Sequence, residues 1–455
     1  MPIQSINPFT GKIIKTYKPH NQKQINEKID QTHKAWRNWR EVTLTDRSAL
    51  IQRASVILNM RKEELAKLMA HEMGKPISGG LAEIEKCIAV CSYYAENAHS
   101  ILDNEIIETD ASKSYISYQP IGVILAIMPW NFPFWQVFRF LAPTLTSGNC
   151  VLLKHASNVP GCALAIEEII IEAGFPPFVF QTLLVGGEEV NNLIENPLIS
   201  AVTLTGSTNA GKKVAEKAAS LLKKAVLELG GSDAYVIFED ADLELAADTC
   251  VNSRIINSGQ SCIAAKRFIA VKSIAKDFTN LFLEKMSAKI MGDPLDKSTE
   301  IGPQARLDLR DELHQQVNRS IAAGASCILG GIIPDSEGVF YPPTILTNVK
   351  KGMPAYDEEL FGPVAAIITA ADEWDAIRIA NDSNFGLGGA VFTENINKGE
   401  EIASKFLQAG SCFVNAMVKS DPRLPFGGIK QSGYGRELGG YGMKEFMNVK
   451  TVYIK

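Results

Sequence analysis

Hydrophobic and polar residues follow two different patterns along the chain, and the change comes near residue 120. Before that point, apolar residues recur at the spacing of one helix face, which predicts helices. In the stretch 46–73 the residues at this spacing are Leu50, Ile51, Ala54, Ile57, Leu58, Leu65 and Leu68. The pattern predicts one helix over 46–73.

From residue 121 onward, short apolar runs alternate with amphipathic stretches. The runs of a first series span 123–128, 150–153, 182–185, 201–204 and 225–227. After Gly230-Gly231 comes a second series, at 234–238, 268–271, 364–369, 389–392 and 411–414. This alternation predicts parallel sheets with crossover helices, so we expect an α/β fold of two units. The glycine pair is the predicted hinge, which places Glu228 at the seam and Cys262 in the second unit.

Two further segments, 112–119 and 448–454, alternate as strands but fit poorly inside a compact unit. Edge-to-edge pairing with another subunit is one use for such arms.

Composition narrows the possible functions. The 455 residues carry a formal net charge of −5, with both signs interspersed and no long basic run. Nucleic acid and anionic membranes are therefore poor candidates for partners, and a small-molecule substrate is expected. The N-terminus lacks the regions of a signal peptide, and no apolar run reaches the ~18 residues of a membrane span. We expect a soluble cytoplasmic protein.

Cysteines and histidines indicate neither a disulfide framework nor a metal. The eight cysteines are scattered and form no CxxC motif, so reduced thiols are expected. The six histidines show no ligand spacing with cysteines or carboxylates, so we predict no metal site.

One cysteine lies in a segment suited to chemistry. Cys262 ends the run Asn257-Ser258-Gly259-Gln260-Ser261-Cys262 and follows Glu228 by 34 residues. A thiol and a carboxylate suggest covalent catalysis with a separate base, but a free thiol is mostly protonated at neutral pH and needs help from its neighbours. Taken alone, such a cysteine is more often a small buried hydrophobe.

Three other candidate sites for ligand binding lie at or directly after the ends of predicted strands. Gly206 and Ser207 lie in a turn that opens a predicted helix, where backbone N–H groups favour an anion such as pyrophosphate. Lys154 ends a strand, where cofactors bind in open α/β sheets, although a solvated lysine is an equal alternative. Asn131, between two prolines, could offer its amide N–H to an oxyanion or simply cap a turn.

Together these segments resemble the aldehyde dehydrogenase superfamily over nearly the whole chain, and most of all the short bacterial succinate-semialdehyde dehydrogenases. The matching motifs are Pro129-Trp130-Asn131-Phe132-Pro133, Thr205-Gly206-Ser207-Thr208, Glu228-Leu229-Gly230-Gly231, Gly259-Gln260-Ser261-Cys262, Glu359-Leu360-Phe361-Gly362-Pro363 and Pro425-Phe426-Gly427-Gly428-Ile429-Lys430. The resemblance implies a Rossmann-like dinucleotide-binding domain at 1–106 and 122–228, an α/β catalytic domain at 229–442 and a small β oligomerisation arm at 107–121 and 443–455.

The resemblance also implies roles for individual residues. Cys262 would be the nucleophile, Glu228 the general base, and Asn131 with the Cys262 N–H the oxyanion hole. The residues that would contact NAD or NADP are Trp130, Asn131, Lys154, Ser157, Gly206, Ser207, Leu229, Glu359 and Phe361. The implied reaction oxidises an aldehyde to an acid through a cysteine thiohemiacetal and thioester. A homodimer or homotetramer is implied as well.

Substrate specificity depends on fewer residues. Arg139 and Ser420 match an arginine and a serine that hold the carboxylate of succinate semialdehyde in the relatives, and a guanidinium suits that task. A structural salt bridge is the alternative for Arg139. The second arginine of better-known members is Ile256 here, with Arg254 two places away, and their second cysteine is Ala264. Broader-range aliphatic or other semialdehydes therefore stay open as substrates.

Cofactor choice is predicted from Ser157. Relatives that prefer NAD usually carry a glutamate there, which binds the ribose 2′-hydroxyl and repels a 2′-phosphate. Serine removes this repulsion, so we expect NADP to be accepted. A non-catalytic scaffold protein is the alternative from another class, since fold alone gives no activity; the intact set of Cys262, Glu228 and Asn131 argues against it.

Overall fold

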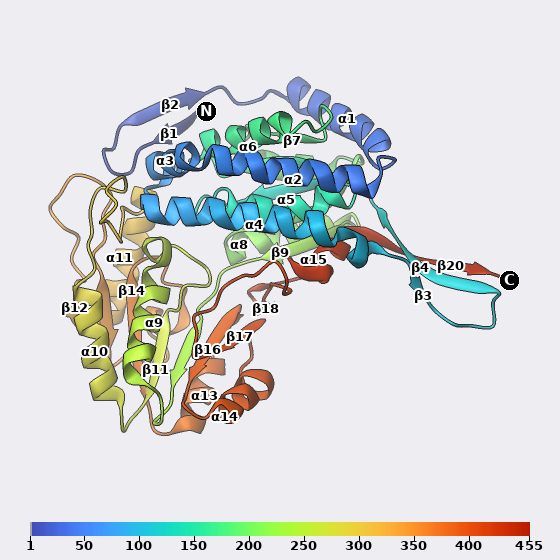
Figure 1. Ribbon diagram of the computed structural model, residues 1–455. Coiled ribbons are helices and arrows are strands. Elements are labelled where there is room, and N and C mark those ends of the chain that lie inside the picture. The colour runs from blue at the N-terminus through green and yellow to red at the C-terminus, as the bar shows by residue number, and fades with distance from the viewer. Residues whose placement is uncertain (1) are drawn as a thin grey trace.

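The computed structural model describes residues 2–455, which form two sheet-based units and a projecting arm (Figure 1). The first sheet has six strands in the order β19-β9-β8-β5-β6-β7. Their bounds are β5 Val123–Met128, β6 Cys150–His155, β7 Phe180–Thr182, β8 Ile199–Thr205, β9 Lys224–Glu228 and β19 Gly433–Tyr434. All neighbours are parallel except β19, which is antiparallel to β9. Four of the five predicted strands are confirmed, whereas the strand predicted at 182–185 is misplaced and overlaps β7 only at Thr182.

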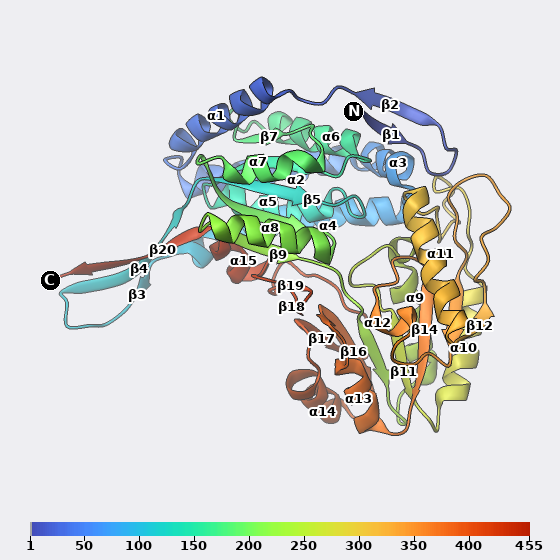
Figure 2. The same cartoon turned by 180° about the vertical axis from the view of Figure 1, so that it is seen from behind.

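Helices cover both faces of this sheet. On one face, α5 (Trp135–Thr146) is entirely buried beneath α2 (Leu44–Met60) and α4 (Ile77–Leu102). On the other face lie α7 (Val190–Glu195) and α8 (Thr208–Ser220), as Figure 2 shows. The remaining elements of this unit are β1 Ile3–Ile6, β2 Ile13–Tyr17, α1 Gln22–Trp39, α3 Lys62–Met73 and α6 Pro160–Glu172. Long apolar side chains from sheet and helices form one continuous core.

The single helix predicted over 46–73 is wrong, because the chain breaks between α2 and α3. Arg61, at the break, has φ −97° and ψ 7°, and its N–H bonds to the carbonyls of Asn59 and Ile57. Its guanidinium pairs with Glu168 and Glu172 on α6 at 3.1 and 2.9 Å. The apolar spacing continues across the break, so the pattern gave no sign of the turn.

The second sheet has seven strands in the order β12-β13-β14-β11-β10-β16-β17. Their bounds are β10 Ala234–Ile237, β11 Arg267–Val271, β12 Ser326–Leu329, β13 Thr344–Thr347, β14 Val364–Ala370, β16 Gly388–Phe392 and β17 Ser411–Val414. Only β12 is antiparallel. Its helices are α9 Leu243–Ile255, α10 Ala275–Ser287, α11 Leu307–Ala322, α12 Pro354–Asp357, α13 Glu373–Asn381 and α14 Ile396–Glu401. The predicted α/β fold of two units is confirmed.

After the second sheet the chain returns to the first. Gly433 of β19 pairs with Glu228 of β9, and α15 (Gly439–Glu445) packs on α4 and α5. This return brings the segment before residue 445 beside the end of β9.

The arm is a three-stranded sheet that projects from the body and carries the C-terminus (Figures 1 and 2). It contains β3 (Glu105–Ile106), β4 (Lys113–Pro120) and β20 (Met447–Ile454), with β20 and β4 antiparallel over their full length. Across residues 2–455, none of the helices is both long and apolar enough to cross a membrane.

Candidate active site

A cavity of about 350 Å³ lies where the two units meet. Its walls come from the ends of β5, β8 and β9 in the first unit and from loops and α11 in the second. The lining residues are Pro129, Trp130, Asn131, Gln136, Thr205, Gly206, Ser207, Leu229, Gly230, Cys262, Leu309, Glu312, Leu313, Gln316, Glu359 and Phe361. Eight of the predicted site residues are among them. Glu228, Arg139, Lys154, Ser157 and Ser420 lie outside this lining.

The loop before Cys262 has an unusual backbone. Asn257, Ser258 and Gly259 have consecutive positive φ angles of 52°, 57° and 76°. Such a conformation costs free energy in residues other than glycine and persists only where the surroundings hold it. Asn257 Nδ2 donates to the Asn131 carbonyl at 2.7 Å. A Cβ on Gly259 would lie 2.2 Å from the carbonyl carbon of Gly362, so no larger residue fits there. The loop is thereby fixed against the end of β5.

Asn131 is buried beside this loop. Its Nδ2 donates to the Gln260 carbonyl at 3.0 Å. A primary amide has two N–H donors, so one stays available for an oxygen atom in the cavity. The geometry is compatible with the predicted oxyanion role.

Burial raises the pKa of the half-buried Cys262 thiol to about 12, while the cations Lys266 and Arg139 lower it. Lys266 Nζ donates to the carbonyls of Ser261 and Cys262 at 2.8 and 2.6 Å. The same nitrogen lies 3.5 Å from a carboxylate oxygen of Glu359. Lys266 therefore links the loop that ends in Cys262 to Glu359 on the opposite side of the cavity. The sequence reasoning missed it, because a lysine four residues after a cysteine is no signal by itself.

Glu228 ends β9 and is only 2% exposed. Burial raises the pKa of its carboxyl group well above the ordinary value, Arg139 lowers it and Glu437 raises it. Among the described residues, neither carboxylate oxygen has a hydrogen-bond partner. A Cβ on Gly427 would lie 2.8 Å from Glu228 Oε1, so the missing side chain leaves room beside the carboxylate. A carboxyl of raised pKa with free oxygens is suited to general base catalysis.

The cofactor side of the cavity begins at the N-terminus of α8. Ser207 caps the helix, and its Oγ accepts from the Ala210 N–H at 3.3 Å. Opposite, Trp130 and Phe361 meet edge to face, with ring centroids 5.8 Å apart. A helix N-terminus, aromatic walls and the Glu359 carboxylate fit the phosphates, rings and ribose hydroxyls of a dinucleotide.

Lys154 and Ser157 lie at and beyond the C-terminal end of β6. Lys154 is buried, which lowers its pKa, while the nearby Glu188 raises it. Ser157 is exposed two residues after the strand. Both residues lie at the sheet edge where strand C-termini gather, outside the lining of the main cavity.

Arg139 lies on α5 and is 3% exposed. Its Nε forms an ion pair with Glu437, and its Nη2 donates to Thr205 Oγ1 at 3.4 Å. The guanidinium also covers the Phe426 ring at 4.9 Å. Arg139 therefore makes a buried salt bridge beside Glu228. Sequence reasoning missed Glu437, which is 298 residues away in the chain.

The other predicted substrate residue, Ser420, is buried and accepts from Lys86 Nζ at 2.9 Å. Arg254 is fully buried and donates to the Gly259 carbonyl at 2.7 Å. Arg254 therefore stabilises the loop 257–262 through this hydrogen bond. It does not substitute for the arginine that Ile256 replaces.

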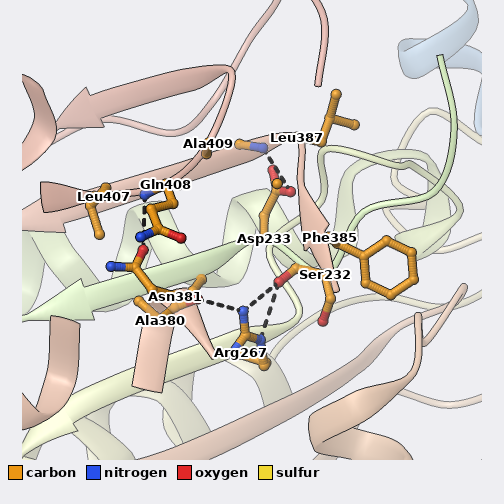
Figure 3. A pocket seen from close by; sticks show the side chains of 14 residues that line it. Ser232, Asp233, Arg267, Ala380, Asn381, Phe385, Leu387, Leu407, Gln408 and Ala409 are labelled. Carbon is orange, nitrogen blue, oxygen red and sulfur yellow. Dashed lines mark hydrogen bonds between the residues drawn. The ribbon is translucent and has the colours of Figure 1, made fainter. Parts of the chain in front are cut away.

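A second cavity, of about 20 Å³, lies behind the hinge (Figure 3). Arg267 donates to the carbonyls of Ser232, Ile379 and Ala380 around it, and Asp233 accepts from the Gly388 N–H. It has room for about one water molecule and serves the packing of the second sheet. Within residues 2–455, no group of three or more histidine, cysteine and carboxylate side chains is arranged to hold a metal ion.

The chain is similar in sequence and in fold to known proteins. Residues 1–452 match the model of the aldehyde dehydrogenase family. The chain belongs to this family. A relative from Synechocystis, named a probable succinate-semialdehyde dehydrogenase [NADP(+)], is 49% identical over 454 residues and covers 100% of both chains. The succinate-semialdehyde dehydrogenase [NADP(+)] of Mycobacterium leprae is 45% identical over 457 residues, again with 100% of both covered.

A solved structure of the same family agrees with the fold. The succinic semialdehyde dehydrogenase of Streptococcus pyogenes, in complex with NADP+, superposes with a TM-score of 0.97 at 36% identity and covers 99% of each chain. The predicted family and fold are confirmed by these matches.

Proposed function

We propose that this aldehyde dehydrogenase oxidises succinate semialdehyde to succinate with NADP or NAD. The observation that carries the proposal is the arrangement of a thiol, an amide and a buried carboxylate around one seam. Cys262 and Asn131 line the cavity, and Glu228 ends the strand beside it. The relatives named for succinate semialdehyde support the choice of substrate.

The first step is addition of the Cys262 sulfur to the aldehyde carbon, which converts the carbonyl oxygen to an oxyanion. The thiol must first lose its proton to a water molecule, and Lys266 and Arg139 favour the thiolate. The free N–H of Asn131 and the backbone N–H of Cys262 stabilise the oxyanion. The nicotinamide cofactor, when bound, supplies the acceptor for the hydride that leaves this carbon. A thioester on Cys262 is then left.

The second step is hydrolysis of the thioester. Glu228 takes a proton from a water molecule, whose oxygen attacks the thioester carbon and releases the acid and the Cys262 sulfur. The space left by Gly427 beside Glu228 Oε1 suits such a water. Because the carboxyl pKa is raised, the fraction of Glu228 able to act as base grows as the pH rises.

NADP is the proposed preferred cofactor. The exposed Ser157 offers a hydroxyl where a glutamate would repel a 2′-phosphate, and the buried Lys154 supplies a nearby positive charge. The ratio of kcat/KM with NADP to that with NAD, measured for the parent and for Ser157→Glu, tests this. We expect the ratio to fall roughly tenfold or more, because a glutamate at this position would repel the 2′-phosphate of NADP. An unchanged ratio would refute the role of Ser157.

The substrate proposal is tested with succinate semialdehyde and butanal, which share a carbon chain but not the carboxylate. We expect the parent to have a kcat/KM for succinate semialdehyde roughly a hundredfold higher. Cys262→Ala, the matched control, should abolish oxidation of both. Equal rates with the two aldehydes would favour the broader-range dehydrogenase instead.

The arm and the cysteines support two further parts of the proposal. The apolar side chains of Ile106, Val449 and Ile454 are exposed on the arm sheet, and a second subunit in a homodimer or homotetramer would bury them. Light scattering of the purified protein, with an arm deletion of 448–455 as comparison, measures the assembly.

All eight cysteines are unpaired, which suits the reducing cytoplasm.

A further inference from the structure

Within residues 2–455, Lys86 is a cation that has no anionic partner, and it lies near Arg139 but outside the lining of the main cavity. It lies in the middle of α4 and is half-buried. No carboxylate of the described residues lies within 4.0 Å of its Nζ, and its one hydrogen bond goes to Ser420 Oγ at 2.9 Å. An ammonium group has three N–H donors, so two remain for another acceptor. A half-buried charge without a counter-ion is costly unless a ligand supplies one.

The position of Lys86 is fixed by the contact between α4 and α5. Glu83, one turn earlier on α4, accepts from the N–H groups of Phe134 and Trp135 at 2.8 and 2.9 Å. The same carboxylate is paired with the buried Lys75 and so is already neutralised. Lys86 Nζ rests over the Trp135 ring, 4.2 Å from its centroid. The aromatic face holds the ammonium in place without neutralising its charge.

Arg139 connects this lysine with the reacting groups. Trp135 and Arg139 are four residues apart on α5 and therefore lie on the same face of the helix. The charge of Arg139 is near enough to lower the pKa of Cys262 and to oppose protonation of Lys86. Arg139, however, is already paired with Glu437, so part of its charge is used within the protein.

We propose that Lys86 binds the distal carboxylate of the substrate, together with Ser420 and Arg139. This inference rests on the proposed oxidation of a carboxylate-bearing aldehyde. Lys86 would donate to the carboxylate through its free N–H groups, while Ser420, which accepts from Lys86, keeps its own hydroxyl hydrogen to donate. Lys86 thus supplies the second positive charge that Ile256 does not. Its pKa, lowered to about 8 chiefly by burial and next by Arg139, keeps it mostly protonated at neutral pH.

The test compares succinate semialdehyde with butanal in the parent, Lys86→Met, Lys86→Gln and Lys86→Arg. Loss of a charged hydrogen bond predicts a KM for succinate semialdehyde roughly tenfold higher in the Met and Gln variants. The kcat/KM for butanal should stay within about twofold, because butanal makes no such contact. Lys86→Arg should recover most of the affinity. Lys62→Met, which removes a partly exposed lysine of α3 that pairs with Glu85 on α4, is the matched control.

The outcomes separate this inference from the proposed function. If the parent does not prefer succinate semialdehyde to butanal, the proposed substrate is wrong. If the parent shows the preference and both neutral variants keep it, Lys86 does not bind the carboxylate. Equal losses with both aldehydes would show a structural role for Lys86 and would also overturn the inference. Butanal turnover and thermal unfolding report whether each variant is folded, and Lys86→Gln, which keeps a polar side chain, guards against failure of Lys86→Met.

Discussion

The two ends of the active-site region are built in different ways. Around Cys262 the groups are held by backbone: three consecutive left-handed residues and carbonyls that accept from Asn257 and Lys266. Around Lys86 the groups are side chains from distant segments, joined by one hydrogen bond to Ser420 and one aromatic contact. The reacting end therefore has a fixed geometry. The other end is defined by its balance of charges, so substitutions there can change substrate choice without moving the nucleophile.

Arg139 is the link between these ends. It pairs with Glu437 and lowers the pKa of both Cys262 and Glu228. A substitution at the reacting end should affect every aldehyde equally, whereas one at the distal end should affect only those with a carboxylate. Arg139 should show both effects.

The largest effect is expected from Glu228→Gln. Glutamine keeps the shape of the side chain but cannot take a proton from water, so steady-state turnover should fall roughly a thousandfold. Formation of the thioester does not need this base, so a first-turnover burst of reduced cofactor should remain. Stopped-flow absorbance measures both. Glu239→Gln, an exposed carboxylate, is the control. A lost burst would mean that Glu228 also deprotonates Cys262.

Sequence motifs bring the residues of the proposed reacting end together because their signals are local, while their catalytic roles stay a prediction. Strands with continuous apolar runs, such as 123–128, were placed at their observed bounds. Cys262 and Asn131 belong to short motifs whose residues remain neighbours in space. The helix break at Arg61 had no such signal, since the apolar spacing continues through it.

The distal end could not be predicted from local patterns. Lys86 and Ser420 are 334 residues apart, and Arg139 and Glu437 meet only because the chain returns to the first sheet after the second. A lysine on an amphipathic helix reads as a solvated side chain until its neighbours are known. Which charges in this buried cluster are paired and which are free depends on contacts that form only in the folded protein.

An intermediate effect is expected from Arg139→Gln. Removing one partner of a buried ion pair typically costs about 3–5 kcal/mol, because Glu437 is left buried and unpaired. The pKa of the Glu437 carboxyl is already raised by burial, and loss of Arg139 would raise it further. A carboxyl whose folded pKa exceeds its unfolded value destabilises the protein as the pH rises through the unfolded pKa. The deficit should therefore grow from acidic toward neutral pH.

Chemical denaturation of the parent and Arg139→Gln at several pH values measures this deficit. Adding Glu437→Gln should remove most of it, since no unpaired charge is then buried. The double variant should still bind succinate semialdehyde weakly, and its kcat/KM for butanal should fall to a smaller extent, because the Cys262 thiol has lost the pKa-lowering effect of Arg139. If the double variant regained the parent's KM for succinate semialdehyde, Arg139 would be a structural residue only.

The smallest effect is expected from Lys266→Met. Lys266 lowers the pKa of the Cys262 thiol against the effect of burial, so its loss should move that pKa upward. Because the thiolate is the nucleophile, thiol reactivity would then appear only at higher pH, and kcat/KM at neutral pH should fall roughly tenfold for all aldehydes. The rate of Cys262 alkylation as a function of pH measures the shift without turnover. Lys285→Met removes a lysine that pairs with Glu244, at the opposite end of α9 from the loop that ends in Cys262, and should leave the profile unchanged. A fall confined to succinate semialdehyde would contradict the separation of the two ends, because Lys266 contacts only the reacting one.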